Sequence, residues 1–219
     1  SATVHVTDDG RVSGVGGDAT VHVGDGGRVA GVYGSAIVHV ERGGRADYVY
    51  GSATVHVGSG GRATEVEGDA TVHVERGGYV GYVGGSATAV VADGGRVATV
   101  GSSATVHVGS GGRVSAVSGD ATAYVADGGR VATVGGSATV HVERGGRVSD
   151  VDCSATVHVA DGGYVGCVYG ATGGQAGGSG PEPLPCICGG DSWPADSDDG
   201  TYQCEACGRC WSLDGQEIS

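Results

Sequence analysis

The sequence lacks the large apolar side chains that fill most protein cores. Its 219 residues include no phenylalanine and no methionine, and the only leucines are Leu184 and Leu213. A conventional core of large apolar side chains is therefore excluded. Valine is the main apolar residue, and its branched side chain favours strands over helices. With 48 glycines beside it, the composition predicts an all-β protein.

Long hydrophobic runs are also missing. No stretch approaches the roughly 18 apolar residues of a membrane-spanning helix. The first residues lack the basic and apolar regions of a signal peptide. We therefore expect a cytoplasmic protein without a membrane partner.

Positive charge is scarce, and the negative charge is unevenly distributed. The formal net charge is −13, of which residues 1–170 carry −6 and residues 171–219 carry −7. The acidity is thus concentrated after residue 170. An acidic decoy that inhibits a nucleic-acid-binding enzyme is one hypothesis, but the modest charge of residues 1–170 argues against it. Direct nucleic-acid binding by a chain of this charge is not expected.

The sequence contains ten gapless repeats of seventeen residues, with the consensus [SD]-A-T-V-H-V-x-x-G-G-R-V-x-x-V-x-G. A fixed period of this size is typical of a solenoid. Helices are disfavoured by the recurrent glycines, and isolated hairpins would have too thin an apolar face. The units begin at Ser1, Asp18, Ser35, Ser52, Asp69, Ser86, Ser103, Asp120, Ser137 and Ser154, and the last one ends at Gly170.

Each unit predicts one coil of two short strands. In the first strand Ala2, Val4 and Val6 alternate with outward-facing residues. In the second, Val12 and Val15 are separated by one residue too many for strict alternation, so we expect a β-bulge that turns both inward. Glycines at unit positions nine, ten and seventeen supply the turns. The prediction is a two-sided β-solenoid of ten 17-residue coils, about 48 Å long.

Equivalent residues of successive coils should lie above one another, so each repeated letter becomes a column. All eight histidines occupy unit position five, where Val90 and Tyr124 interrupt them. We interpret this histidine column as a stacked ladder that aligns the coils, with metal capture by neighbouring imidazoles as an alternative. Protonating such closely spaced rings should destabilise the rod as the pH falls through about 6.5. The column contains His5, His22, His39, His56, His73, His107, His141 and His158.

Two further columns face outward. A threonine column at unit position three runs from Thr3 to Thr156, with Ile37 as its exception. Threonine ladders occur in ice-binding solenoids, which makes ice binding an alternative function, although the neighbouring histidines are bulky and ionisable. An arginine column at position eleven includes Tyr79 and Tyr164. Its expected role is charge pairing within the rod. The arginines are Arg11, Arg28, Arg45, Arg62, Arg96, Arg113, Arg130 and Arg147.

A cysteine-rich segment follows the repeats. Two cysteine pairs, C-x-C-G-G and C-x-x-C-G-R, are separated by fifteen residues. Four thiolates satisfy tetrahedral zinc, and a glycine after each pair allows the backbone turn that such a site needs. The predicted ligands of a Zn²⁺ cofactor are Cys186, Cys188, Cys204 and Cys207. A fifth thiol, Cys210, could replace one of them.

The domain organisation follows from these patterns. We expect a β-solenoid domain at residues 1–170, a Gly/Pro-rich linker at 171–185, and a zinc ribbon with a C-terminal tail at 186–219. Disulfide bonding is the alternative for a module too small to fold on its own core, but five cysteines would leave one unpaired. Cys153 and Cys167 occupy non-equivalent positions in the last two units, and we interpret them as tolerated small residues.

These motifs resemble known protein types. The "SATV" units with glycine or aspartate punctuation look like repeat proteins of actinobacteria and their phages, and residues 184–213 resemble a zinc ribbon, with one residue fewer than usual in the first cysteine pair. If phage-encoded, the protein could be part of the virion. Serine, histidine and aspartate occur in separate columns, which does not indicate a catalytic site. We therefore expect a non-enzymatic structural or interaction protein that presents its columns to a protein partner or to itself, with the zinc ribbon as a docking module.

Overall fold

The structure is a computed structural model, and it describes residues 2–92, 94–152 and 154–169 together with the short segments 184–185, 191–194, 202–204 and 210–211. Of residues 167–169 and of the four short segments, only the backbone is described. All regular structure in the described residues is β-strand, which confirms the all-β prediction.

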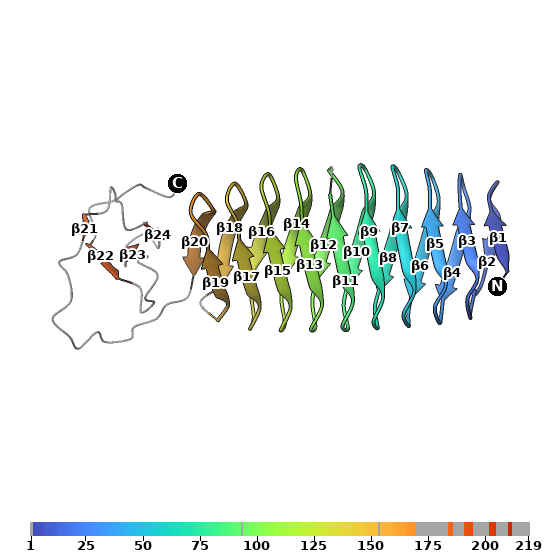
Figure 1. Cartoon of the computed structure of the whole chain (residues 1–219), viewed down its shortest axis with the longest axis horizontal. Helices are drawn as coiled ribbons and strands as arrows, with labels where there is room; N and C mark the ends of the chain where they lie inside the picture. Colours follow the sequence, from blue (N-terminus) through green and yellow to red (C-terminus); the bar gives the residue numbers. More distant parts are fainter. Residues whose placement is uncertain are drawn as a thin grey trace.

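The first strand of every unit belongs to one ten-stranded parallel sheet, here called the histidine sheet. Its strands follow one another in sequence order along the rod (Figure 1). They are β1 (Thr3–Val6), β3 (Thr20–Val23), β5 (Ile37–Val40), β7 (Thr54–Val57), β9 (Thr71–Val74), β11 (Thr88–Val91), β13 (Thr105–Val108), β15 (Thr122–Val125), β17 (Thr139–Val142) and β19 (Thr156–Val159).

The second strand of every unit belongs to another ten-stranded parallel sheet, the arginine sheet. Its strands are β2 (Arg11–Val12), β4 (Arg28–Val32), β6 (Arg45–Val49), β8 (Arg62–Val66), β10 (Tyr79–Val83), β12 (Arg96–Val100), β14 (Arg113–Val117), β16 (Arg130–Val134), β18 (Arg147–Asp152) and β20 (Tyr164–Tyr169). The two sheets and the turns between them make a two-sided β-solenoid, as predicted.

The pairing register places equivalent residues of neighbouring coils side by side. His5 pairs with His22, and His22 pairs with His39. In the arginine sheet Arg28 likewise pairs with Arg45. A shift of one residue would expose the valines, so the buried face fixes this register. The columns expected from the sequence are therefore confirmed.

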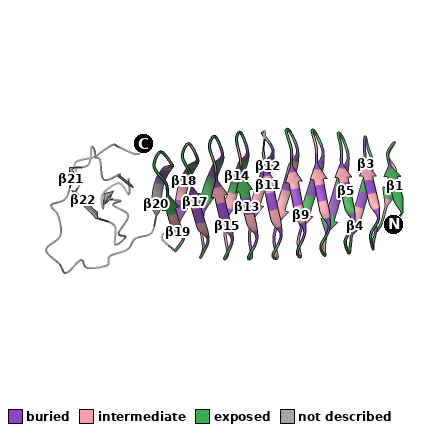
Figure 2. Ribbon diagram, viewed as in Figure 1, coloured by how far each residue is buried: buried purple, intermediate pink, exposed green. Residues whose placement is uncertain are grey.

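The core between the sheets consists of valine and alanine. Val21, Val38 and Val55 are fully buried, as are Ala36 and Ala53. Within the strands, buried positions alternate with partly exposed ones (Figure 2). Because both residue types are small, the two sheets pack closely and the rod stays thin. The core-facing valines and alanines of the inner coils are removed from water, which stabilises a chain that lacks larger apolar residues.

The extra residue in the second strand has the expected effect on the core. In the pair β8–β10 the register joins Val80 to Ala63 and Val83 to Val66, and it omits the residue at unit position thirteen. All four of these residues are buried. Each coil carries its extra residue at the same place, so the strands depart from regular pairing together and stay aligned.

The glycines of the first turn have two different roles. At unit position nine, residues such as Gly26 have a positive φ, here 69°, which glycine adopts without steric cost. At position ten the constraint is space, because an added Cβ on Gly44 would overlap the carbonyl oxygen of Val23. The sequence predicted the turn but not this close approach between coils.

Four short strands after the rod form an antiparallel sheet in the order β21 (Leu184–Pro185), β22 (Asp191–Pro194), β23 (Tyr202–Cys204) and β24 (Cys210–Trp211). The domain boundaries at 170/171 and 185/186 stay predictions. The described part of the chain contains no helix long and apolar enough to cross a lipid bilayer.

Candidate functional site

The histidine column is a stack of parallel rings on the outer face of the histidine sheet. Neighbouring rings from His5 to His73 lie 4.8 to 5.0 Å apart between centroids, with interplanar angles of 11°. Tyr124 continues the stack between His107 and His141, at 4.9 Å from each. Val90 divides the column into two runs, whereas Tyr124 does not interrupt it.

The environment of His56, in the middle of the first run, favours its neutral imidazole. Burial lowers the pKa of His56, and the charges of His73 and His39 lower it further, against an opposing effect of Glu75. Near the N-terminal end, Nδ1 of His22 lies 3.6 Å from Oε1 of Glu41. In the described residues, no group of three or more histidine, cysteine or acidic side chains is placed to hold a metal ion. The column is thus a stack of rings in which His56 is held toward its neutral form.

The threonine column runs beside the histidines on the same face. Its members pair in register, as Thr54 does with Thr71 and Thr71 with Thr88. Ile37, its exception, is 43% exposed and is one of the few large apolar side chains on the surface. The column presents hydroxyl and methyl groups at a regular spacing, next to the imidazole rings.

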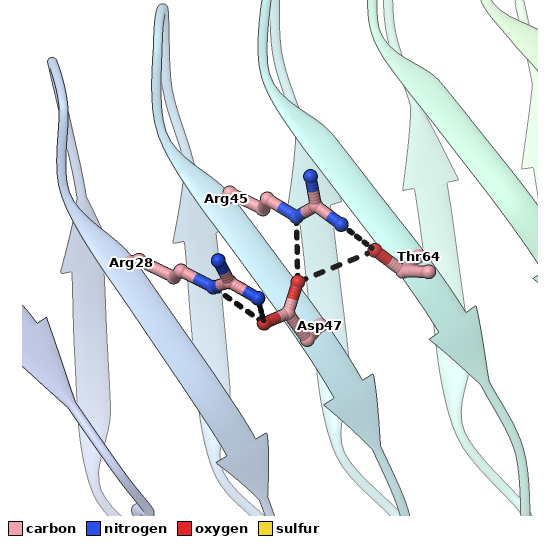
Figure 3. Close-up of polar contacts among 4 residues, drawn as sticks. All are labelled: Arg28, Arg45, Asp47 and Thr64. Carbon is pink, nitrogen blue, oxygen red and sulfur yellow. Dashed lines mark hydrogen bonds and ion pairs between the residues drawn. The ribbon is translucent and has the colours of Figure 1, made fainter.

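Two members of the arginine column, Arg28 and Arg45, pair with one buried carboxylate. Asp47 accepts a hydrogen bond of 2.6 Å from Nε of Arg28 and another of 2.6 Å from Nε of Arg45 (Figure 3). Nη2 of Arg28 also lies 2.6 Å from it. Thr64 donates its hydroxyl to Asp47 at 3.4 Å and accepts from Arg45 at 3.3 Å. The network joins strands β4, β6 and β8.

Asp47 stays ionised over a wide pH range. Burial opposes its charge, but the hydrogen bonds and charges of Arg45 and Arg28 outweigh this and hold the pKa of the carboxyl below its usual 3.8. Asp47 is the buried charged residue of the described core. Sequence reasoning expected pairing within the rod but missed this residue, although it stands two positions after Arg45 and therefore on the same strand face.

Tyrosines in the arginine column stack with their neighbours. The guanidinium carbon of Arg62 lies 5.0 Å from the ring centroid of Tyr79, and that of Arg147 lies 5.6 Å from the ring of Tyr164. A hollow of about 280 Å³ lies beside Tyr79 and is lined by Arg62, Arg96 and glycines of the adjacent turns. The column thus contains two cation–π pairs.

Three further tyrosines gather near the N-terminal end of the arginine sheet. The ring centroids of Tyr33 and Tyr50 are 6.0 Å apart, and those of Tyr48 and Tyr50 are 6.3 Å apart, with interplanar angles of 13° and 5°. Tyr33 is 51% exposed and Tyr48 is 46% exposed. We call these three residues the tyrosine platform. Sequence reasoning missed it, because the platform occupies only two units and forms no column.

The predicted zinc ligands cannot be placed as a site. Cys186, Cys188 and Cys207 lie outside the described residues. Cys204 ends strand β23 and Cys210 begins strand β24, but only their backbone is described. The two strands pair antiparallel. The four-thiolate set and the alternative ligand Cys210 therefore stay predictions from the spacing of the sequence.

No protein-family model and no curated protein matches the chain. A solved structure that resembles it is the crystal structure of a TibC-catalyzed hyper-glycosylated TibA55-350 fragment, with 22% sequence identity and a TM-score of 0.42, over 78% of this chain and 93% of that chain. We therefore infer the function from this chain's own residues.

Proposed function

We propose that the protein is a non-enzymatic structural and interaction protein, whose rod presents the threonine, histidine and arginine columns to a protein partner or to a second copy of itself. One observation carries the proposal: the outward-facing side chains keep the same register across both ten-stranded sheets. A partner that recognises one coil meets the same side chains again in the next.

The order of the histidine rings supports a binding role as well as a structural one. A stack of five rings with equal spacing is pre-organised, so a partner loses little free energy in ordering it. The rod itself is stabilised between neighbouring coils, as expected for a repeat protein. Its outer columns can therefore vary without loss of the core, which makes the face available for recognition.

A test of this role uses the full chain and a set of column variants. Immobilised protein captures partners from cells that produce it, and the captured protein is purified and its affinity measured against each variant. The histidine variant carries His39→Gln, His56→Gln and His73→Gln, and the control carries Ser59→Ala and Ser110→Ala at exposed turn positions outside the columns. A partner that reads the column loses affinity for the first variant and keeps it for the control.

The result must be separated from a change in folding. Circular dichroism and thermal melting of each variant identify those that keep the solenoid, and only these are compared for binding. If no captured protein distinguishes the histidine, threonine or arginine column variants from the control, the proposed recognition of columns is wrong.

We propose end-to-end stacking as the route of self-association. Strand β1 is the terminal strand of the histidine sheet in the described chain, and its Thr3 and His5 are exposed. A strand at a sheet edge offers unpaired backbone groups to another strand. Sedimentation velocity at increasing concentration tests this route, and a strict monomer at high concentration would contradict it.

We further propose that residues 186–219 form a zinc ribbon in which Cys186, Cys188, Cys204 and Cys207 hold Zn²⁺. A segment of this size is too small to fold on its own core, and bound zinc would supply the missing stabilisation. Its expected role is to dock the rod onto another component. Docking and column recognition would then be carried out by different parts of the sequence.

A further inference from the structure

The two long edges of the rod differ in charge. The edge that follows the strands of the arginine sheet, here called the acidic edge, comprises unit positions fourteen to seventeen and position one of the next unit. These positions contain seven acidic residues and no arginine. The eleven arginines of the repeats lie at positions eight and eleven, around the other turn. The acidic residues are Asp18, Glu65, Glu67, Asp69, Asp120, Asp150 and Asp152.

The tyrosine platform lies on this acidic edge. Tyr33 lies against the backbone of its own coil, since an added Cβ on Gly31 would lie 2.6 Å from the Tyr33 hydroxyl oxygen. The same ring reaches the preceding coil, where a Cβ on Gly14 would lie 3.7 Å from its edge. The absence of a side chain at Gly31 lets the ring lie on the surface, whereas a Cβ on Gly14 would make only an ordinary contact with it. Its companions Tyr48 and Tyr50 follow in the next coil.

Two carboxylates continue the platform. Glu65 and Glu67 occupy in the fourth unit the positions that Tyr48 and Tyr50 occupy in the third, and Tyr48 pairs with Glu65 in the register of β6 and β8. Both glutamates are half-buried. Burial raises the pKa of Tyr50, and the charges of Glu65 and Glu67 raise it further. The phenol of Tyr50 therefore stays neutral, beside the two carboxylates.

This combination suits a guanidinium group. A planar cation stacks on a tyrosine ring and is attracted by neighbouring carboxylates, and arginine does this better than lysine because it is planar and less strongly hydrated. The pairs Arg62–Tyr79 and Arg147–Tyr164 make the same contact within the rod. The ring separations of 6.0 and 6.3 Å approach the roughly 6.6 Å between alternate residues of an extended chain.

A second copy of the rod is a weaker candidate for this surface. In such a copy all eleven arginines of the repeats lie at unit positions seven to eleven, on the edge opposite the acidic edge. These positions also contain nine acidic residues, so the net charge of this opposite edge is only +2. Residues 1–170 as a whole carry −6, and two such rods repel each other. A basic segment of another protein is attracted both by the platform and by the overall field.

We propose that the tyrosine platform, with Glu65 and Glu67, is a docking site for an extended, arginine-rich segment of a partner protein. This inference deepens the proposed interaction function and rests on it. Alternate arginines of the segment stack on the exposed rings, and the two glutamates pair with the next arginine along.

The probe is a fluorescein-labelled peptide of alternating arginine and serine, titrated with the full chain and followed by fluorescence anisotropy. The variant Tyr33→Ser/Tyr48→Ser/Tyr50→Ser loses at least about tenfold in affinity, because stacking contributes to each contact. The matching Tyr→Phe variant keeps the rings and stays close to wild type. A peptide with lysine in place of arginine binds several-fold more weakly.

A charge-matched control separates the platform from general electrostatic attraction. Glu65→Gln/Glu67→Gln removes two carboxylates at the platform, and Asp120→Asn/Asp150→Asn removes two from the same edge elsewhere. The first weakens binding by about tenfold and the second by less than about twofold. Equal losses in both, or full binding by the serine variant, would mean that the peptide binds diffusely or to the acidic residues after 170, and would overturn the proposal.

Failure here is distinguishable from failure of the proposed function. A natural partner whose affinity depends on the histidine column but not on the tyrosines would support column recognition and overturn the platform as its docking site. Self-association that the tyrosine variant abolishes, measured by sedimentation, would overturn the assignment of the occupant to another protein.

Discussion

Removal of the Asp47 carboxylate is the sharpest perturbation of the rod. Asp47→Ala leaves Arg28 and Arg45 without their shared acceptor and removes the link between β4, β6 and β8. Other units carry alanine at the same position, for example Ala98 and Ala132. The substitution is therefore compatible with the backbone of the coil, and any loss reflects the network and not a steric clash.

The magnitude follows from the contacts. Hydrogen bonds to charged groups contribute about 1.5–3 kcal/mol each, and Asp47 accepts one from each arginine at 2.6 Å. The two arginine side chains are 47% and 45% exposed, so water solvates them once the carboxylate is gone, and screening reduces the net loss. We expect Asp47→Ala to lower the free energy of unfolding by about 2 kcal/mol.

Amide hydrogen exchange is the appropriate assay, because stability in a repeat array varies from coil to coil. A loss of about 2 kcal/mol raises exchange rates in β4, β6 and β8 by about 30-fold. Asp120→Ala, which removes an exposed carboxylate, serves as the control. The contribution of Asp47 is present above pH 3.8 and disappears as the pH falls through its lowered pKa. A loss below about 0.5 kcal/mol, or an equal loss in the control, would refute this reasoning.

Three other predictions concern the turn, the histidine column and the cysteines. Gly44→Ala should lower the free energy of unfolding in urea by at least about 2 kcal/mol, because the added Cβ overlaps the Val23 carbonyl. Gly16→Ala should be neutral or slightly stabilising, because no atom lies within 4 Å of the added Cβ. The melting temperature should fall between about pH 8 and about pH 5, since the lowered pKa of His56 makes the folded rod favour the neutral ring. The contribution of neutral His56 to the free energy of unfolding is complete above pH 6.5. It is lost as the pH falls from 6.5 to the lowered pKa of His56. Metal analysis should give one zinc per chain, which Cys204→Ser removes.

Each of these measurements has a matched control. Equal effects of the two glycine substitutions would contradict the close approach at unit position ten. His56→Gln should reduce the pH dependence, and a melting temperature that does not change with pH would refute the proposed effect of protonation. Cys153→Ser/Cys167→Ser should keep the zinc, because these cysteines belong to the last two repeats. If they release it as Cys204→Ser does, the predicted ligand set is wrong.

The sequence predicts the fold well because one physical constraint is repeated ten times. Small apolar residues at unit positions two, four, six, twelve and fifteen must face inward in every coil, and this fixes the number of strands, the register and the columns. Features that occur once do not benefit from this repetition. Asp47 stands at a position where the residue type changes from unit to unit. Its burial depends on two arginines that reach across neighbouring strands, which no periodic pattern indicates.

The tyrosine platform was missed for a related reason. Its residues occupy unit positions fourteen and sixteen of two adjacent units, and at these positions the repeat has no consensus. The position of the Tyr33 ring depends on Gly31, which leaves room for it. Local departures from the consensus thus mark the sites where one stretch of the rod differs chemically from the rest.

The direction of the backbone hydrogen bonds determines how the shaft carries mechanical load. Strands of successive coils pair side by side, and even the turns are linked from coil to coil, as between Gly60 and Gly77. Tension applied lengthwise therefore stretches all the bonds at one coil boundary simultaneously, whereas peeling from the edge breaks them one after another. The shaft should resist stretching and yield by unravelling from a tip.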